Sequence, residues 1–192
     1  QLYNMVDSMV VGRFVGEDAL AAVGSSFPVV FLSVAVASGL SMGCTVVISQ
    51  FFGAGKIREM KVTVSTALIS LGLIGLLIMG MGELISGPLL KLLGTDPDIM
   101  ADSLIYLKIY FGGAVFLFLY NSLNGIYNAL GDSQTPLKFL IVSALTNIVL
   151  DLLFVIKFHM GVAGVAWATL IAQGLCAFIS FWVLIHRMRR ME

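Results

Sequence analysis

Long runs without a charged side chain constrain this chain more than any other feature. Residues 19–55, 62–82, 109–131 and 162–185 contain no aspartate, glutamate, lysine or arginine. A helix needs about 20 apolar residues to cross roughly 30 Å of bilayer hydrocarbon. Over the whole chain 59% of residues are hydrophobic and 11% are charged, whereas about a quarter are charged in a typical soluble domain. The sequence therefore predicts an all-α polytopic membrane protein, a bundle of helices, and argues against a soluble globular fold.

Charges, glycines and prolines divide these runs into six predicted spans. The chain opens on an apolar half-length stretch that stops at Arg13, so we expect it to begin partway along a helix and to be a fragment of something longer. Pro28 suits the first turn of a helix, and the part of the run before it is predicted to be loop. Residues 83–102 contain two prolines and several charges and are predicted to be interfacial. The spans, which form one lobe over residues 1–192, are 1–13 (partial), 26–52, 62–82, 102–130, 136–156 and 162–186.

The distribution of basic residues predicts the orientation of these spans, because cytoplasmic loops are enriched in lysine and arginine. With a cytoplasmic C-terminus, the inside loops hold Lys56, Arg58, Lys61, Lys138, Arg187, Arg189 and Arg190, and the outside loops hold Arg13, Lys91 and Lys157. Seven against three favours this assignment. We therefore expect a multi-pass protein of the plasma membrane, surrounded by membrane lipid, with the C-terminus of this chain in the cytoplasm.

Asp151 is an ionisable group inside the predicted span 136–156, where a charge costs about 2.5–3.5 kcal/mol. Asn147 lies one turn earlier on the same face. At a rise of 1.5 Å per residue, Asp151, Asp7 and Thr169 each lie about 9–10 Å from the outer ends of their spans. Each unsatisfied polar group in lipid costs several kcal/mol. We therefore expect these four side chains to converge.

Two carboxylates, an amide oxygen and a hydroxyl form an oxygen-rich site of the kind that hard cations prefer. Two neighbouring carboxylates can also share a proton. The residues thus predict a coupling site for Na⁺ or H⁺, with no structural metal and no other cofactor. The alternative is that Asp151 and Asn147 only join helices by hydrogen bonds, and Thr169 taken alone could bond its own backbone four residues earlier.

A second polar stripe follows the predicted span 102–130. Its side chains could line a cavity or could hold helices together, and the sequence favours neither; with Gln173 on the last span, the candidates for cavity lining are Asn121, Asn124, Tyr127 and Gln173. Gly39 and Gly43 form a GxxxG pair, which is typical of close contact between membrane helices.

Motifs for other functions are missing. Cys44 and Cys176 form no CxxC pair, residues 53–56 lack the frame of a phosphate-binding loop, and no HExxH is present. Eleven basic and eleven acidic residues balance, so charge gives no sign of nucleic-acid binding. We expect neither an enzyme nor a nucleic-acid partner.

Six short segments, taken in their order and spacing, resemble the MATE (multidrug and toxic compound extrusion) transporters. They are NMVDSMVVGR at 4–13, GEDALAAVG at 16–24, ISQFFGAG at 48–55, GDSQTP at 131–136, NIVLD at 147–151 and GVAGVAWAT at 161–169. The similarity covers essentially the whole chain, and nothing in the chain departs from the pattern.

The resemblance implies the N-terminal lobe of a two-lobe transporter, with the C-terminal lobe missing from this chain. It implies export of drugs and other cationic or amphipathic small molecules in exchange for Na⁺ or H⁺, by alternating access. Asp7, Asn147, Asp151 and Thr169 match the residues that form a cation site in this lobe. The rival hypotheses are a lipid-linked oligosaccharide flippase of the related superfamily, which would need a basic cavity, an intramembrane enzyme, and a non-transporting half-transporter fragment.

Overall fold

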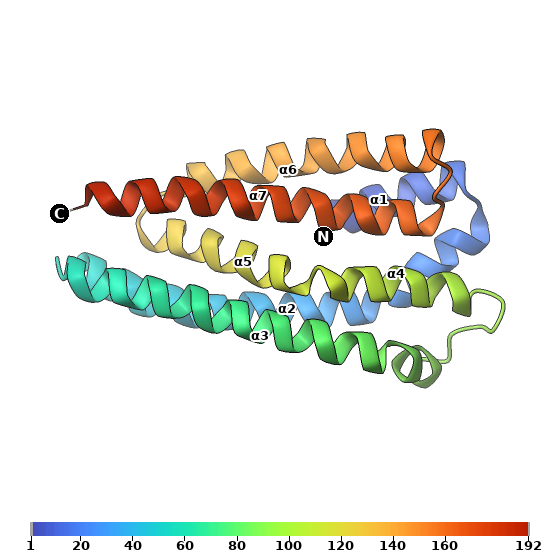
Figure 1. Ribbon diagram of the computed structural model, residues 1–192, viewed down its shortest axis with the longest axis horizontal. Helices are drawn as coiled ribbons and strands as arrows, with labels where there is room; N and C mark the ends of the chain where they lie inside the picture. Colours follow the sequence, from blue (N-terminus) through green and yellow to red (C-terminus); the bar gives the residue numbers. More distant parts are fainter. Residues whose placement is uncertain (1, 192) are drawn as a thin grey trace.

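The computed structural model describes residues 2–191. In that part of the chain the regular structure is helical: α1 (Leu2–Phe14), α2 (Glu17–Gly53), α3 (Ile57–Leu92), α4 (Met100–Gly112), α5 (Ala114–Ala129), α6 (Gln134–Leu152), a turn of π-helix η1 (Leu153–Lys157), and α7 (Val162–Arg190). The helices run back and forth along an elongated bundle (Figure 1). The α2–α3 and α5–α6 connections lie at the same end as the C-terminus, and the other connections between antiparallel helices lie at the opposite end. The predicted all-α bundle is confirmed.

The helices have the lengths that a membrane requires. Four of them (α2, α3, α6 continued by η1, and α7) are long and apolar enough to span a membrane, and α4 with α5 makes a fifth if the bent pair is one span. Helix α1 has 13 residues, fewer than the roughly 20 that a span needs. The first predicted span also includes residue 1, which lies outside the described residues. Which end of the bundle faces the cytoplasm stays a prediction.

Two prolines lie further inside helices than the sequence predicts. Pro28 is in the interior of α2, which begins at Glu17, and Pro88 is in α3, which continues to Leu92. The predicted loop before residue 26 is therefore wrong from Glu17 on, and so is the predicted helix end at residue 82. The interfacial position of residues 83–102 stays a prediction. A proline in a helix removes a hydrogen bond, but membrane helices tolerate it because neighbouring groups can satisfy the freed backbone carbonyl.

Glycines allow the closest contacts between helices of the bundle. They are not the glycines of the GxxxG pair that the sequence indicated. Gly39 and Gly43 have open space beside them within the described chain, so the predicted close contact at this pair is wrong there. At Gly75 on α3, an added Cβ would lie 2.8 Å from the Cα of Val115 on α5. An added Cβ at Gly82 would overlap the ring of Phe111. These two glycines let α3 lie directly against α4 and α5.

The predicted helix 102–130 is two helices joined at Gly113. Helices α4 and α5 meet there at a bend of 49°. Gly113 faces α7, because a Cβ at this position would lie 3.0 Å from Leu170 Cγ. The bend lets both halves of the pair pack against α7.

Helix α6 begins with a cap from the preceding loop. The predicted span begins at residue 136, whereas α6 begins two residues earlier, at Gln134. The side chain of Asp132 accepts hydrogen bonds from the backbone N–H of Thr135 (3.0 Å) and from its hydroxyl (2.7 Å). Arg187 on α7 forms an ion pair with the same carboxylate. The start of α6 is thereby fixed to the last turns of α7.

Candidate functional site

Helices α1, α6 and α7 bring four polar side chains together in the interior of the bundle. Asp7 comes from α1, Asn147 and Asp151 from α6, and Thr169 from α7. The three side chains from α1 and α6 are fully buried, and Thr169 is 5% exposed. These four residues are called the carboxylate cluster below.

The reason that α6 turns this face inward is its pattern of polar residues. Its buried residues are Ser143, Ala144, Asn147 and Asp151, which recur at intervals of one helical turn. The opposite face is apolar, and its Leu145 and Val149 side chains are 60% and 63% exposed. In lipid, such a helix places its polar side chains against other helices and its leucines outward.

Hydrogen bonds join the two carboxylates of the cluster into one chain. The Thr169 hydroxyl lies 3.1 and 3.0 Å from Oδ1 and Oδ2 of Asp7, to which it donates. The Asn147 amide Nδ2 donates to Thr169 Oγ1 at 3.1 Å and is 3.5 Å from Asp151 Oδ1. The four side chains that were predicted to converge therefore do lie together. That they bind a cation stays a prediction.

Tyr106 on α4 belongs to the same group of side chains and was missed in the sequence analysis. Its hydroxyl donates to Asp7 Oδ2 at 3.2 Å and lies 3.4 Å from Oδ1 of Asn4. The available signal was its position, four residues into the predicted span 102–130 and so about 6 Å from the same end as Asp7. A buried tyrosine hydroxyl usually has a partner, and Asp7 is that partner here.

Two oxygens of the cluster have no donor. Asn147 Oδ1 and Asp151 Oδ2 are buried and lack a hydrogen-bond partner within residues 2–191. Neither carboxylate forms an ion pair with a basic side chain in that part of the chain. Buried oxygens without a donor are uncommon and call for an explanation, of which a bound ion is one. Because carboxylate and carbonyl oxygens are the ligands that hard cations prefer, the residues present fit a small cation.

The second predicted set forms no such cluster. Asn121 accepts a hydrogen bond from Ser38 of α2 through Oδ1 (3.1 Å), and its backbone carbonyl accepts one from Ser41 (2.7 Å). Tyr127 is fully buried and donates to the backbone carbonyl of Ser180 on α7 at 2.8 Å. These bonds join α5 to its neighbours and favour the interhelical interpretation of Asn121 and Tyr127.

The side chains of Asn124 and Gln173 show no comparable hydrogen bonds to neighbouring helices within the described residues. Asn124 Oδ1 is buried without a hydrogen-bond partner among the described residues. Gln173 is 8% exposed. Lining of a cavity stays a prediction for both residues.

Comparison with known proteins identifies the family. A family model described as MatE matches residues 1–153. The chain belongs to the MATE family. It is 32% identical over 187 residues to the probable multidrug resistance protein YpnP of Bacillus subtilis, and 33% identical over 188 residues to YoeA of the same organism, which bears the same description. A protein named FAD transporter from Shewanella oneidensis is 25% identical over 194 residues.

Solved MATE structures have the same fold. The chain superposes on a crystal structure of MATE in the bent conformation with a TM-score of 0.90 at 28% identity, covering 97% of this chain and 42% of that one. An inward-facing multidrug resistance MATE transporter gives a TM-score of 0.90 at 27% identity. The matches to YpnP and YoeA cover 97% and 96% of this chain and 42% and 40% of those proteins. This MATE chain therefore spans about two fifths of the length of the curated relatives it matches, and it is a multi-pass membrane chain.

Proposed function

We propose that this chain is the cation-coupling lobe of a MATE antiporter that exports drugs and other cationic or amphipathic small molecules across the plasma membrane. The observation that carries the proposal is the pair of donor-free buried oxygens, Asn147 Oδ1 and Asp151 Oδ2, next to a hydrogen-bonded chain that reaches Asp7. The names of the relatives YpnP and YoeA as probable multidrug resistance proteins support export of drugs. The substrate path would lie between this lobe and a second lobe outside this chain.

The proposed coupling between ion binding and conformation follows from the position of the two carboxylates on different helices. Asp7 is on α1 and Asp151 is on α6. A Na⁺ or a proton between them reduces their repulsion and so favours the arrangement in which α1 lies against α6 and α7. An ion can shift a conformational equilibrium only through its different affinity for the two states. Entry of the ion from outside would then favour release of the substrate outward.

Na⁺ and H⁺ make different demands on the same oxygens. Na⁺ would take several of the cluster oxygens as ligands, including the two without a donor. A proton would need only one carboxyl oxygen and an acceptor, which is also available here. The flippase alternative would need a basic cavity and is less suited to this interior, because the buried polar side chains of the described residues are carboxylates, amides and hydroxyls, with no lysine or arginine among them.

The test is an efflux assay on the natural full-length protein in proteoliposomes, with the Na⁺ and pH gradients varied separately. Asp151→Asn should abolish ion-driven efflux of a cationic dye, because the amide keeps the size of the side chain but lacks the charge that the ion compensates. The variant should still insert in the membrane. Asp132→Asn, which removes a carboxylate outside the cluster, serves as the control and should keep efflux. Efflux at the wild-type rate by Asp151→Asn would disprove the mechanism.

A further inference from the structure

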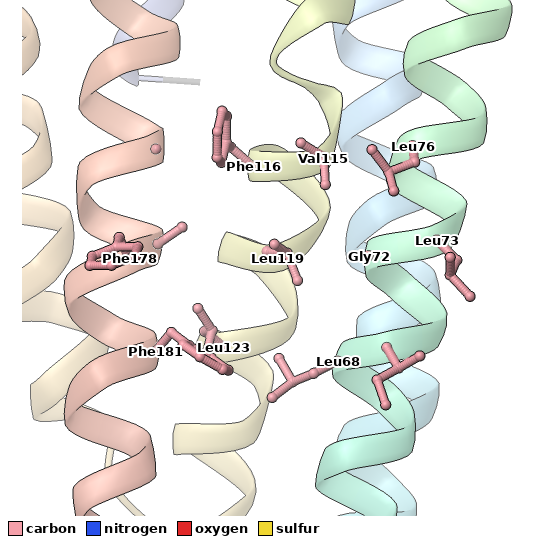
Figure 2. Close-up of a pocket in the computed structure, with 13 residues that line it drawn as sticks. Leu68, Gly72, Leu73, Leu76, Val115, Phe116, Leu119, Leu123, Phe178 and Phe181 are labelled. Atoms are coloured by element: carbon pink, nitrogen blue, oxygen red, sulfur yellow. The ribbon is translucent and has the colours of Figure 1, made fainter.

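An apolar groove runs along the outside of the bundle between α3 and α7. Both helices pack against α5 and have little contact with each other, so α5 forms the floor. Figure 2 shows Leu119 on α5 between Gly72 and Leu73 of α3 and Phe178 of α7. The hollow has a volume of about 430 Å³. Gly72 and Gly174 deepen it, because a Cβ at either position would reach side chains of the floor, Leu119 at 3.6 Å and Phe116 at 3.5 Å.

The groove continues toward the C-terminal end of α7. A second hollow of about 470 Å³ shares Leu68, Ile69 and Phe181 with the first. Its lining also includes Lys61 on α3 and Arg189 on α7. No acidic side chain lines either hollow, and neither cation forms an ion pair within residues 2–191. An apolar channel therefore ends at two unpaired positive charges.

The length of the groove matches one leaflet. From Leu76 to Lys61 the groove follows α3 over 15 residues, or about 22 Å at 1.5 Å per residue. Half of a bilayer, with its headgroup region, is about 20–22 Å thick. Trp182 lines a neighbouring hollow together with His186 and Arg189 and is stacked on His186, with ring centroids 5.2 Å apart; tryptophan is typical of the headgroup level.

We propose that this groove binds an anionic phospholipid from the leaflet around the C-terminal end of α7. An acyl chain lies between α3 and α7 on α5, and the phosphate lies between Lys61 and Arg189. The charges decide against a protein segment as the occupant. An apolar helix laid over the whole groove would bury two cations without a partner, which is strongly unfavourable. A lipid phosphate supplies that partner.

The first experiment measures lipid retention by native mass spectrometry of the natural full-length protein, delipidated and then titrated with phosphatidylglycerol or phosphatidylcholine of the same acyl chains. The wild type should bind phosphatidylglycerol at least about fivefold more tightly, since each basic side chain near an anionic headgroup contributes about this factor. The double variant Lys61→Gln/Arg189→Gln should lose the preference. Arg58→Gln/Arg190→Gln removes the same charge from the same two helix ends but outside the groove lining, and it should keep the preference.

The second experiment tests the apolar part. Gly72→Leu fills the groove and should weaken binding of both lipids, whereas Gly80→Leu changes α3 where no other atom lies within 4 Å and should have no effect. In the wild type, phosphatidylglycerol with a photoactivatable acyl chain should label peptides containing residues 68–76 or 115–123. The proposal is overturned if both charge variants lose the preference equally, if Gly72→Leu binds like Gly80→Leu, or if the wild type retains no lipid. Both experiments measure lipid binding and not transport. Their outcome therefore tests the lipid site independently of the antiport mechanism.

Discussion

Helices α6 and α3 are both apolar over most of their length, yet they bury opposite kinds of residue. The inward face of α6 consists of Ser143, Ala144, Asn147 and Asp151. The inward face of α3 consists mostly of small or apolar residues, among them Ala67, Gly75 and Gly82. In water the apolar face of a helix turns inward, but lipid is as apolar as leucine. The inward face of α6 is therefore the one that carries its polar side chains, and the inward face of α3 is the one that allows close packing.

The largest effect on stability should come from filling the packing face of α3. Gly82→Leu places a side chain where the Phe111 ring lies, and overpacking of this kind typically costs about 1–3 kcal/mol. We expect a lower midpoint of thermal unfolding and a lower yield of folded protein in detergent. Gly80→Leu, two residues earlier on the open side of α3, should unfold as the wild type does. Equal stability of the two variants would show that α3 is not held by this contact.

A smaller effect should come from the polar face that α6 shares with its neighbours. Tyr106→Phe removes the hydroxyl that donates to Asp7 Oδ2, and a hydrogen bond of this kind contributes about 1 kcal/mol. Because a donated hydrogen bond favours the charged carboxylate, its loss should raise the apparent affinity of the cluster for a coupling proton about fivefold, while the maximal rate of efflux at saturating ion stays near that of the wild type. The measurement is initial efflux rate against Na⁺ concentration and against pH. A fall in thermal stability without a change in ion dependence would leave Tyr106 a purely structural residue.

The smallest effect is expected at Asp132, which belongs neither to the inward face of α6 nor to that of α3. Partial burial raises the pKa of this carboxyl, but hydrogen bonds from Thr135 and Arg187 and the charge of Arg187 outweigh it and keep the pKa below its ordinary value. Asp132→Asn should therefore lower stability by about 1 kcal/mol or less at neutral pH. A lowered pKa in the folded protein gives stability that is present above the unfolded pKa of about 3.9 and is lost as the pH falls through the folded pKa. Thermal unfolding from pH 7 to pH 3 should show the two proteins converging below about pH 4.

The polar interior could be predicted from the sequence because polar groups in apolar runs have few partners. Asp7, Asn147, Asp151 and Thr169 stand out against leucine and valine, and the rise per residue placed them at one depth. Tyr106 does not stand out in this way, since a tyrosine close to the end of a membrane helix is also typical of an interfacial anchor. Its contact with Asp7 depends on the rotation of α4, and the sequence around it does not determine that rotation.

Helix ends and packing contacts were predicted less well, for a physical reason in each case. Pro28 was assigned to the first turn of a helix and Pro88 to an interfacial segment by rules that hold in water, where a broken hydrogen bond can be replaced by solvent. Gly39 and Gly43 match a packing motif, but a motif does not show whether a bulky partner lies opposite. Gly82 packs closely because Phe111 lies opposite it, and that depends on how α3 and α4 are placed relative to each other.

The hydrogen-bonded chain between the carboxylates can also be described by counting its hydrogens. A threonine hydroxyl has one hydrogen and a side-chain amide has two. The one of Thr169 points at Asp7, and those of Asn147 are directed at Thr169 and Asp151. The hydrogen bonds between the two carboxylates thus have a fixed donor-to-acceptor direction. A flip of the Asn147 amide would break both of the hydrogen bonds that it donates. The carbonyl oxygen of Asn147 has no donor because the hydrogens of Thr169 and of the Asn147 amide are already donated to other acceptors.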